Sequence, residues 1–159
     1  AKDDISLTSA SSLIGQTEGT LYIEVDWRAT DGVDQVLFEV SDASSNNKVT
    51  IFNDDSNDEL RMLANANNVP VIDQGESSTA YTGIQKFAFA YKSNDFELYR
   101  NGLSKSDDNT NAFAVSSTLT DVDLGQDQNA GTQANMHIRA VALFDSRLSN
   151  TDLATLTTI

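Results

Sequence analysis

The sequence contains no cysteine, one proline (Pro70) and one histidine (His137). Without cysteine the chain forms no disulfide and no thiolate metal site, and it has no cysteine nucleophile. With a single proline, its strand-like runs remain uninterrupted. No apolar run approaches the roughly 20 residues that a membrane-spanning helix needs, so we expect no membrane insertion.

Positive charge is also scarce. The chain has 10 Lys and Arg residues against 24 Asp and Glu residues, which gives a formal net charge of −14. Such a surface repels phosphate backbones, so we expect no nucleic-acid partner. Carboxylate-rich loops could attract metal cations instead.

The 159 residues are enough for one domain with a real core, and we assign residues 1–159 to a single domain. Hydrophobic residues make up 39% of the chain, while Asn, Asp, Ser and Thr are abundant. This composition is typical of a turn-rich β protein in which one sheet face is solvated.

The clearest pattern is a β-hairpin over residues 85–102. Phe87, Phe89 and Tyr91 alternate with small or polar residues, so they lie on one face of a strand. A polar turn follows, and a second alternating run ends at Asn101-Gly102, which is a strong turn signal. The aromatic face requires a second layer to cover it.

Further alternating runs predict strands at 5–7, 20–28, 36–40, 48–54, 60–64, 69–72, 122–125 and 136–144. Residues 73–83 and 103–111 read as polar loops, and 112–120 as a loop with one short strand. A short helix follows Ser149, a good N-cap, and its Leu153 and Leu156 are expected to face a sheet. The fold class is therefore all-β: an antiparallel two-sheet sandwich or jelly roll with one short C-terminal helix.

Four segments carry a family resemblance: SSLIGQTEGTLYIEVDW (11–27), the hairpin IQKFAFAYKSNDFELYRNG (84–102), VDLGQ (122–126) and HIRAVALFDSRLSNTDLATL (137–156). Together they resemble laminin-G-like, concanavalin A-like lectin/glucanase jelly-roll domains. The GQTEGT and Gly-Gln-Asp-Gln elements look most like such domains in bacteriophage tail fibres, tailspikes and other virion surface proteins. The resemblance implies a virion-surface or extracellular location, with cell-surface glycans or other virion proteins as partners.

A catalytic motif is missing. Glucanases that share this fold carry Glu-x-Asp-x-x-Glu on one strand, and the nearest match here is Glu24, Asp26 and Ala29, which lacks the last carboxylate. We interpret Glu24 and Asp26 as the solvent face of a strand and His137 as a sheet-surface residue. The sequence therefore predicts that the chain is not an enzyme.

Two acidic groups could bind Ca²⁺, because carboxylate oxygens are its preferred ligands. The first is the loop that contains Asp54, Asp55, Asn57, Asp58 and Glu59, and the second contains Asp121, Asp123, Asp127 and Asn129. The loop lacks the glycine and the ligand spacing of an EF-hand. Laminin-G-like domains often carry one Ca²⁺ near the sheet rim, whereas the alternative is a solvated acidic surface.

Sugar-binding sites combine an aromatic ring with planar hydrogen-bonding groups. Trp27 and Tyr91 share faces with apolar residues and are assigned to the core. Tyr99 lies on the opposite face from Leu98 and is the better surface aromatic. The predicted ligand-binding residues are Tyr99, Arg100, Glu97, Arg61 and Arg139.

These observations predict a non-catalytic carbohydrate-binding or adhesion module of a phage virion or tail fibre. The alternative is a structural or decoration domain of the virion, which would mediate protein assembly without a sugar site. Exposed strand edges are compatible with such docking, and homo-oligomerisation stays open.

Overall fold

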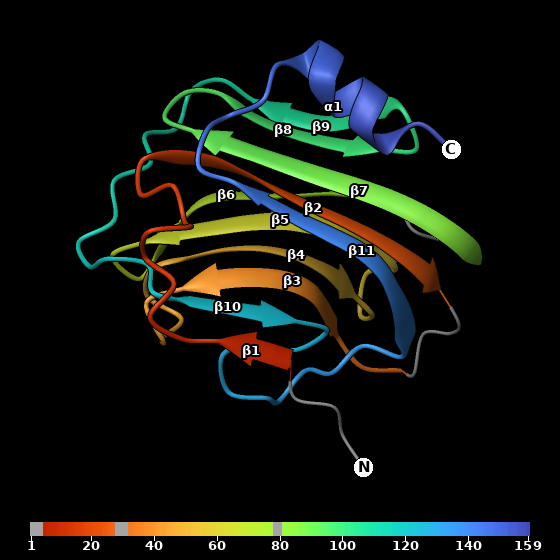
Figure 1. Ribbon diagram of the computed structural model, residues 1–159, viewed down its shortest axis with the longest axis horizontal. Coiled ribbons are helices and arrows are strands. Elements are labelled where there is room, and N and C mark those ends of the chain that lie inside the picture. Colours follow the sequence, from red (N-terminus) through yellow and green to blue (C-terminus); the bar gives the residue numbers. More distant parts are fainter. Residues whose placement is uncertain (1–4, 28–31, 78–80) are drawn as a thin grey trace.

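The computed structural model describes residues 5–27, 32–77 and 81–159. Two antiparallel sheets pack face to face, and one helix lies outside them (Figure 1). This arrangement confirms the predicted sandwich with a short C-terminal helix. Arg28, Ala29 and Asp31, which the sequence placed at the end of a strand and in its turn, lie outside the described residues.

Sheet A has six strands in the order β1-β10-β3-β4-β5-β6. Their bounds are β1 Ile5–Leu7, β10 Asp121–Leu124, β3 Gln35–Ser41, β4 Lys48–Asp54, β5 Glu59–Ala66 and β6 Val69–Ser77. The four strands from β3 to β6 form a continuous meander. Its first strand, β3, then pairs with β10, which comes from much later in the chain.

Sheet B has five strands in the order β11-β2-β7-β8-β9. They are β11 Met136–Phe144, β2 Glu18–Trp27, β7 Gly83–Lys92, β8 Phe96–Arg100 and β9 Leu103–Asp108. The predicted hairpin is β7 and β8, in which Phe89 pairs with Leu98. Asn101 and Gly102 turn the chain into β9 with φ values of 49° and 81°, and two such positive angles are characteristic of a type I′ turn.

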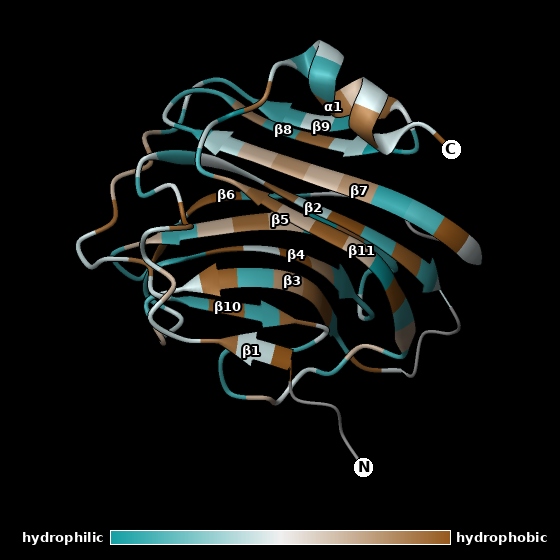
Figure 2. Cartoon of the chain, viewed as in Figure 1, coloured by the Kyte–Doolittle hydropathy of each residue, from teal (hydrophilic) through white to brown (hydrophobic). Residues whose placement is uncertain are grey.

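The core lies between the two sheets and follows the two-residue alternation. Phe87, Phe89 and Tyr91 of β7 are fully buried, as the sequence predicted. From sheet A, Ile51 and Met62 are equally buried and belong to the same cluster. Apolar segments accordingly recur along the central strands in Figure 2.

The outer face of sheet B is covered by α1 (Asn150–Thr157). Ser149 caps this helix, since its side chain accepts a 3.2 Å hydrogen bond from the backbone N–H of Asp152. Leu153 is fully buried against Tyr22 and Tyr99, and Leu156 packs beside it. The sequence prediction of this helix and of its sheet-facing side is therefore confirmed.

Three loop predictions were wrong in part. Residues 103–108 form β9, and β6 continues to Ser77, because both segments pair with a neighbouring strand although their own apolar pattern is weak. Residues 112–120 contain no strand. Two apolar side chains, Phe113 and Leu119, bury themselves in the core without strand pairing.

The described residues contain no helix with the length and apolar character required to cross a membrane.

Candidate functional site: a groove on the outer face of sheet A

The five predicted ligand-binding residues do not form one site. Tyr99 is only 9% exposed and Glu97 only 6%, because α1 lies over both of them. The side chain of Glu97 accepts hydrogen bonds from Ser104 and Asn150. The prediction that Tyr99 is a surface aromatic was therefore wrong, since the alternation along a strand cannot show that a helix returns to cover that face.

Arg100 lies between the sheets at a different edge of the sandwich. Its guanidinium carbon lies 4.2 Å from the ring centroid of Tyr81, and its Nη1 atom lies 3.0 Å from Glu76 of β6. Lys105 joins the same carboxylate at 3.4 Å. This cluster closes one side of the sandwich, so we assign Arg100 a structural contact at that edge.

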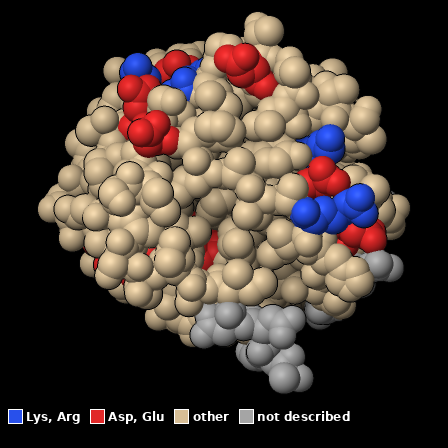
Figure 3. All heavy atoms as spheres, in the orientation of Figure 1, with Lys and Arg blue, Asp and Glu red and all other residues tan. Residues whose placement is uncertain are grey.

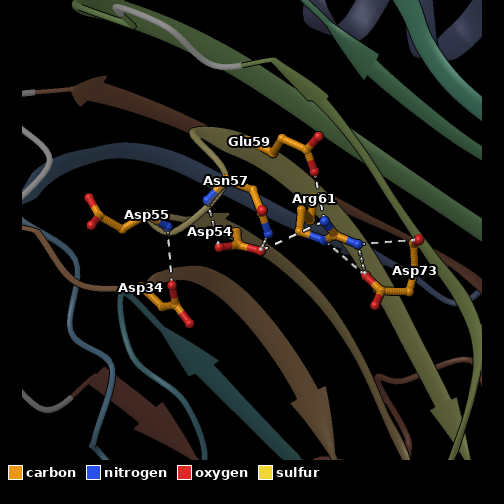
Figure 4. Close-up of polar contacts among 7 residues, drawn as sticks. All are labelled: Asp34, Asp54, Asp55, Asn57, Glu59, Arg61 and Asp73. Atoms are coloured by element: carbon orange, nitrogen blue, oxygen red, sulfur yellow. Dashed lines mark hydrogen bonds and ion pairs between the residues drawn. The ribbon is translucent and has the colours of Figure 1, made fainter.

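Arg61 and Arg139 are separated as well. Arg139 lies on β11 and pairs with Glu24 at 2.8 Å. Arg61 lies on β5 in sheet A, where its guanidinium contacts Asp73 at 2.7 Å and Glu59 at 2.6 Å (Figure 4). Each arginine is therefore already paired with carboxylates of the chain.

The acidic loop predicted to bind Ca²⁺ is held together by the protein's own donors. Asp54 accepts a 2.7 Å hydrogen bond from the side chain of Asn57 and lies 3.7 Å from Arg61. Asp55 uses its backbone N–H to bind Asp34 at 3.1 Å (Figure 4). Asp58 is exposed at the loop tip and has a positive φ of 51°.

Two residues of the second predicted metal group, Asp121 and Asp123, lie on β10, whereas Asp127 and Asn129 lie in the loop that follows it. Asp121 and Asp123 pair with Ser41 and Glu39 of β3, respectively. Asp123 is 5% exposed. Within residues 5–27, 32–77 and 81–159, no group of three or more His, Cys, Asp or Glu side chains is placed to hold a metal ion. Calcium binding stays a prediction.

A different part of the molecule is hollowed in a manner that suits a ligand. A groove of about 130 Å³ lies on the outer face of sheet A. It is lined by Asp34, Val36, Lys48, Thr50, Phe52, Leu63, Asp127 and Thr132. We call it the sheet A groove.

Strand register explains the floor of this groove. Glu39 pairs with Thr50, and Thr50 pairs with Leu63, so the three side chains share one face across β3, β4 and β5. Phe52 lies two residues along β4 on the same face, whereas Val49 and Ile51 point into the core. The alternation that fills the core therefore also leaves Phe52 half-buried on the outside.

The wall of the groove is the 125–134 loop, which folds back over β3. The backbone N–H of Val36 donates to the carbonyl oxygen of Thr132 at 3.3 Å, and that of Gly125 donates to Leu37 at 2.9 Å. Within the loop, Asp127 accepts hydrogen bonds from the N–H groups of Gly131 (2.7 Å) and Asn129 (3.1 Å). Partial burial raises the pKa of Asp127, but these hydrogen bonds outweigh it and leave the pKa below its ordinary value.

A buried ion pair lies beside the floor. Nζ of Lys48 is 2.9 Å from Oε2 of Glu39, whose side chain is fully buried. The other carboxylate oxygen accepts a 3.1 Å hydrogen bond from the backbone N–H of Gln128. Burial raises the pKa of Glu39, and the nearby Lys48 opposes that rise only in part.

The groove thus offers the two ingredients of a sugar site. Phe52 supplies an aromatic surface, and polar groups surround it. The hydroxyl oxygen of Thr50 is buried and has no hydrogen-bond partner among the described residues. The volume is smaller than the roughly 300–1,000 Å³ of pockets for drug-sized ligands, so it suits a single ring that lies partly outside it.

Sequence reasoning missed these residues although a signal for them was present. Phe52 alternates with Val49 and Ile51, which places an aromatic side chain on the solvent face of a strand. Asp127 was predicted only as a member of the second acidic group, and Lys48 gave no signal. They join Phe52 only through the fold of the 125–134 loop and the pairing of β3 with β4.

No protein-family model matches the chain, and no curated protein matches it significantly in sequence. Solved structures do resemble it. The CBM40 module of the Ruminococcus gnavus IT-sialidase superposes with a TM-score of 0.73 at 15% identity, over 98% of this chain and 97% of the module. The same module bound to α2,3-sialyllactose gives a TM-score of 0.71 at 16% identity, over 99% and 97% of the two chains.

A full-length enzyme contains a similar domain. The NanB sialidase of Streptococcus pneumoniae gives a TM-score of 0.73 at 17% identity, over 95% of this chain and 26% of the sialidase. The chain thus spans about a quarter of the length of that enzyme. These likenesses show the fold of the chain, a two-sheet β-sandwich of the jelly-roll kind. The Ruminococcus gnavus module, which is matched over nearly its whole length, is a carbohydrate-binding module.

Proposed function

We propose that this protein is a non-catalytic carbohydrate-binding module and that the sheet A groove is its binding site. The observation that carries the proposal is the half-buried ring of Phe52 in a groove with polar walls. A pyranose ring would pack its C–H face on Phe52 while its hydroxyls meet Thr50 and the aspartates at the margins. The sequence resemblance extends the proposal to adhesion to cell-surface glycans by a phage virion or tail fibre, in a virion-surface or extracellular location.

The fold supports this proposal indirectly. Carbohydrate-binding modules with the same two-sheet architecture are seen with sialyllactose bound. Fold alone does not imply function, so the argument depends on the groove itself. The helix α1 packs on the outer face of sheet B against Tyr22 and Tyr99, whereas the sheet A groove lies on the other sheet.

A glycan array followed by NMR titration tests the proposal. A bound glycan should shift the backbone amide signals of Thr50 and Phe52. Phe52→Ala should weaken binding about tenfold, since the contribution of an aromatic contact, about 0.5–1.5 kcal/mol beyond its area, adds to the buried area that is lost. Leu103→Ala is the matched control, because Leu103 is 63% exposed on β9 of the other sheet. Binding that survives Phe52→Ala unchanged would contradict the proposed site.

A second candidate function is supported by an apolar groove at the opposite side of the core from Arg100. This edge groove has a volume of about 260 Å³ and lies between the β1-β10 edge of sheet A and β11 of sheet B. Ile5, Leu7 and Leu13 at its rim are 47%, 50% and 54% exposed. In the view of Figure 3, most charged side chains lie toward the margins, and acidic atoms are also visible in the central hollow.

Exposed apolar patches of this kind mark protein-interaction sites. The alternative function is therefore a structural or decoration domain of the virion, docked through the edge groove to another virion protein or to a second copy. Sedimentation velocity distinguishes the two functions. A dimer or trimer that Leu13→Lys dissociates would favour the assembly function. A protein that is monomeric at all concentrations would exclude self-association through the edge groove.

A further inference from the structure

We infer that the sheet A groove selects uncharged sugars and rejects acidic ones such as sialic and uronic acids. The inference rests on the proposed function and deepens it, because it assigns the chemical class of the ligand.

Negative charge outweighs positive charge in the lining of the sheet A groove. Asp34 and Asp127 both line the groove, and Lys48 is the one lysine or arginine among the described lining residues. Asp34 is exposed, and its carboxylate accepts a hydrogen bond from the N–H of Asp55. The hydrogen bonds within the 125–134 loop keep Asp127 ionised. A ligand in the groove therefore meets two carboxylates.

Lys48 is not available to a ligand anion, because it is already paired with Glu39. Its Nζ lies 2.9 Å from Glu39, and its side chain is only 14% exposed. A sugar carboxylate would have to compete with a buried carboxylate that is already in contact with it. The sugar carboxylate would lose its hydration on entering the groove, and no cation among the described lining residues other than Lys48, which Glu39 already occupies, would compensate for that cost.

Arg61 is the next cation along the floor of the groove, since it pairs with Phe52 across β4 and β5. The guanidinium binds Asp73 through Nε at 2.9 Å and through Nη2 at 2.7 Å. Its Nη1 atom contacts Glu59 at 2.6 Å (Figure 4). Arg61 therefore has carboxylate partners on both sides and offers no free fork to an acidic sugar.

These contacts predict a preference opposite to that of modules seen with sialyllactose. Carboxylate oxygens accept hydrogen bonds from sugar hydroxyls, so the same groups that repel an anion bind a neutral ring well. Because Asp34 is exposed, mobile ions screen part of its repulsion of an acidic sugar, and this repulsion should weaken as the salt concentration rises. The expected difference between a neutral glycan and its acidic counterpart is at least tenfold.

The test uses matched pairs of defined glycans that differ only in the charge of one sugar type: 3′-sialyllactose and its methyl ester, and a hyaluronan oligosaccharide and its carboxyl-reduced form. Each is titrated into the ¹⁵N-labelled protein at 0.05 M and 0.5 M NaCl, and the shifts of Thr50 and Phe52 are followed. We expect the neutral member of a pair to bind at least tenfold more tightly at low salt, with a smaller difference at high salt. An acidic member that binds at the groove as tightly as its neutral partner overturns the inference but leaves the proposed function standing. If no glycan shifts these signals, the proposed function fails together with the inference.

Two variants locate the cause. Asp34→Asn keeps an oxygen that can accept a hydrogen bond from the N–H of Asp55 but removes one negative charge. It should reduce the difference in affinity between the neutral and the acidic glycan of a pair by several-fold. Glu39→Gln leaves Lys48 without its carboxylate and should raise the affinity for 3′-sialyllactose above that of the parent protein. Asp145→Asn is the matched control, because Asp145 is exposed and lies outside the groove lining. If Asp145→Asn narrows the difference as much as Asp34→Asn, overall charge and not the groove is responsible, and the inference is overturned.

Discussion

Lys48 and Glu39 face each other from adjacent strands of sheet A, with Nζ 2.9 Å from Oε2 and the carboxylate fully buried. Their strands pair so that Lys48 lies opposite Ser41, one same-face step from Glu39. The pair therefore joins β3 to β4 directly beside the proposed sugar site. The same ion pair stabilises sheet A, by neutralising a buried carboxylate, and occupies the lysine that lines the groove.

Lys48→Met should destabilise the fold strongly at neutral pH. The change leaves the Glu39 carboxylate buried without its cation, and such a loss costs about 3–5 kcal/mol. Urea unfolding measures the difference. The matched control is Lys92→Met, since Lys92 forms a 3.2 Å pair with Glu18 in which both side chains are partly exposed, and exposed pairs contribute about 0–1 kcal/mol. Equal losses in the two variants would show that Glu39 does not depend on Lys48.

Glu39→Gln should change how stability depends on pH. Burial raises the pKa of Glu39 in the folded state above the ordinary value of 4.5, so the folded protein binds the proton at a pH where the unfolded chain has released it. The stability that this group contributes is fully present below about pH 4.5 and is lost as pH rises through the raised pKa. The unfolding free energy of the parent protein relative to Glu39→Gln should therefore fall as pH rises above 4.5. Parallel profiles would contradict this prediction.

Thr50→Val should stabilise the free protein while it weakens glycan binding. The Thr50 hydroxyl oxygen is buried without a partner among the described residues, and replacing an unsatisfied buried polar group by an apolar one of the same shape recovers about 1–3 kcal/mol. Thermal unfolding and NMR titration provide the two measurements. Thr155→Val, an exposed position on α1, is the control for the substitution itself. A loss of stability in Thr50→Val would show that this hydroxyl is satisfied in solution.

Leu153→Ala should loosen α1 from sheet B. Leu153 is fully buried against Tyr22 and Tyr99, and truncation of a buried leucine costs about 2–5 kcal/mol. Near-UV circular dichroism should report the change through the tyrosines. Ile159→Ala, at a residue that is 72% exposed, should leave both stability and spectrum unchanged. A spectrum of Leu153→Ala identical to that of the parent protein would show that the helix does not hold these rings.

Calcium can be tested directly at the predicted aspartates. If the predicted aspartates bind Ca²⁺, 5 mM CaCl₂ should raise the melting temperature above its value in 5 mM EDTA, because a ligand that binds only the folded state stabilises it. Asp54→Asn or Asp123→Asn should then abolish the rise. Equal melting temperatures of the parent protein in the two solutions would contradict calcium binding and would fit an Asp54 already satisfied by Arg61 and Asn57.

The sequence alone determined the features that depend on local pattern. The alternation of Phe87, Phe89 and Tyr91 identified a strand and its buried face, because successive side chains on a strand point to opposite sides. Ser149 and Leu153 identified the helix and its contact side through capping and spacing. The weakly patterned β9 escaped detection, since an edge strand of polar residues forms only when β8 is present to pair with it.

Only the tertiary structure decided what lies over the two outer faces of the sandwich. Tyr99 and Phe52 have the same appearance in the sequence: each is an aromatic residue on the face of a strand that points away from the core. The helix α1 covers Tyr99, whereas the 125–134 loop walls the groove beside Phe52 and leaves the ring half-buried. Strand alternation fixes which side chains share a face, but segments distant in the chain determine whether that face meets protein or solvent.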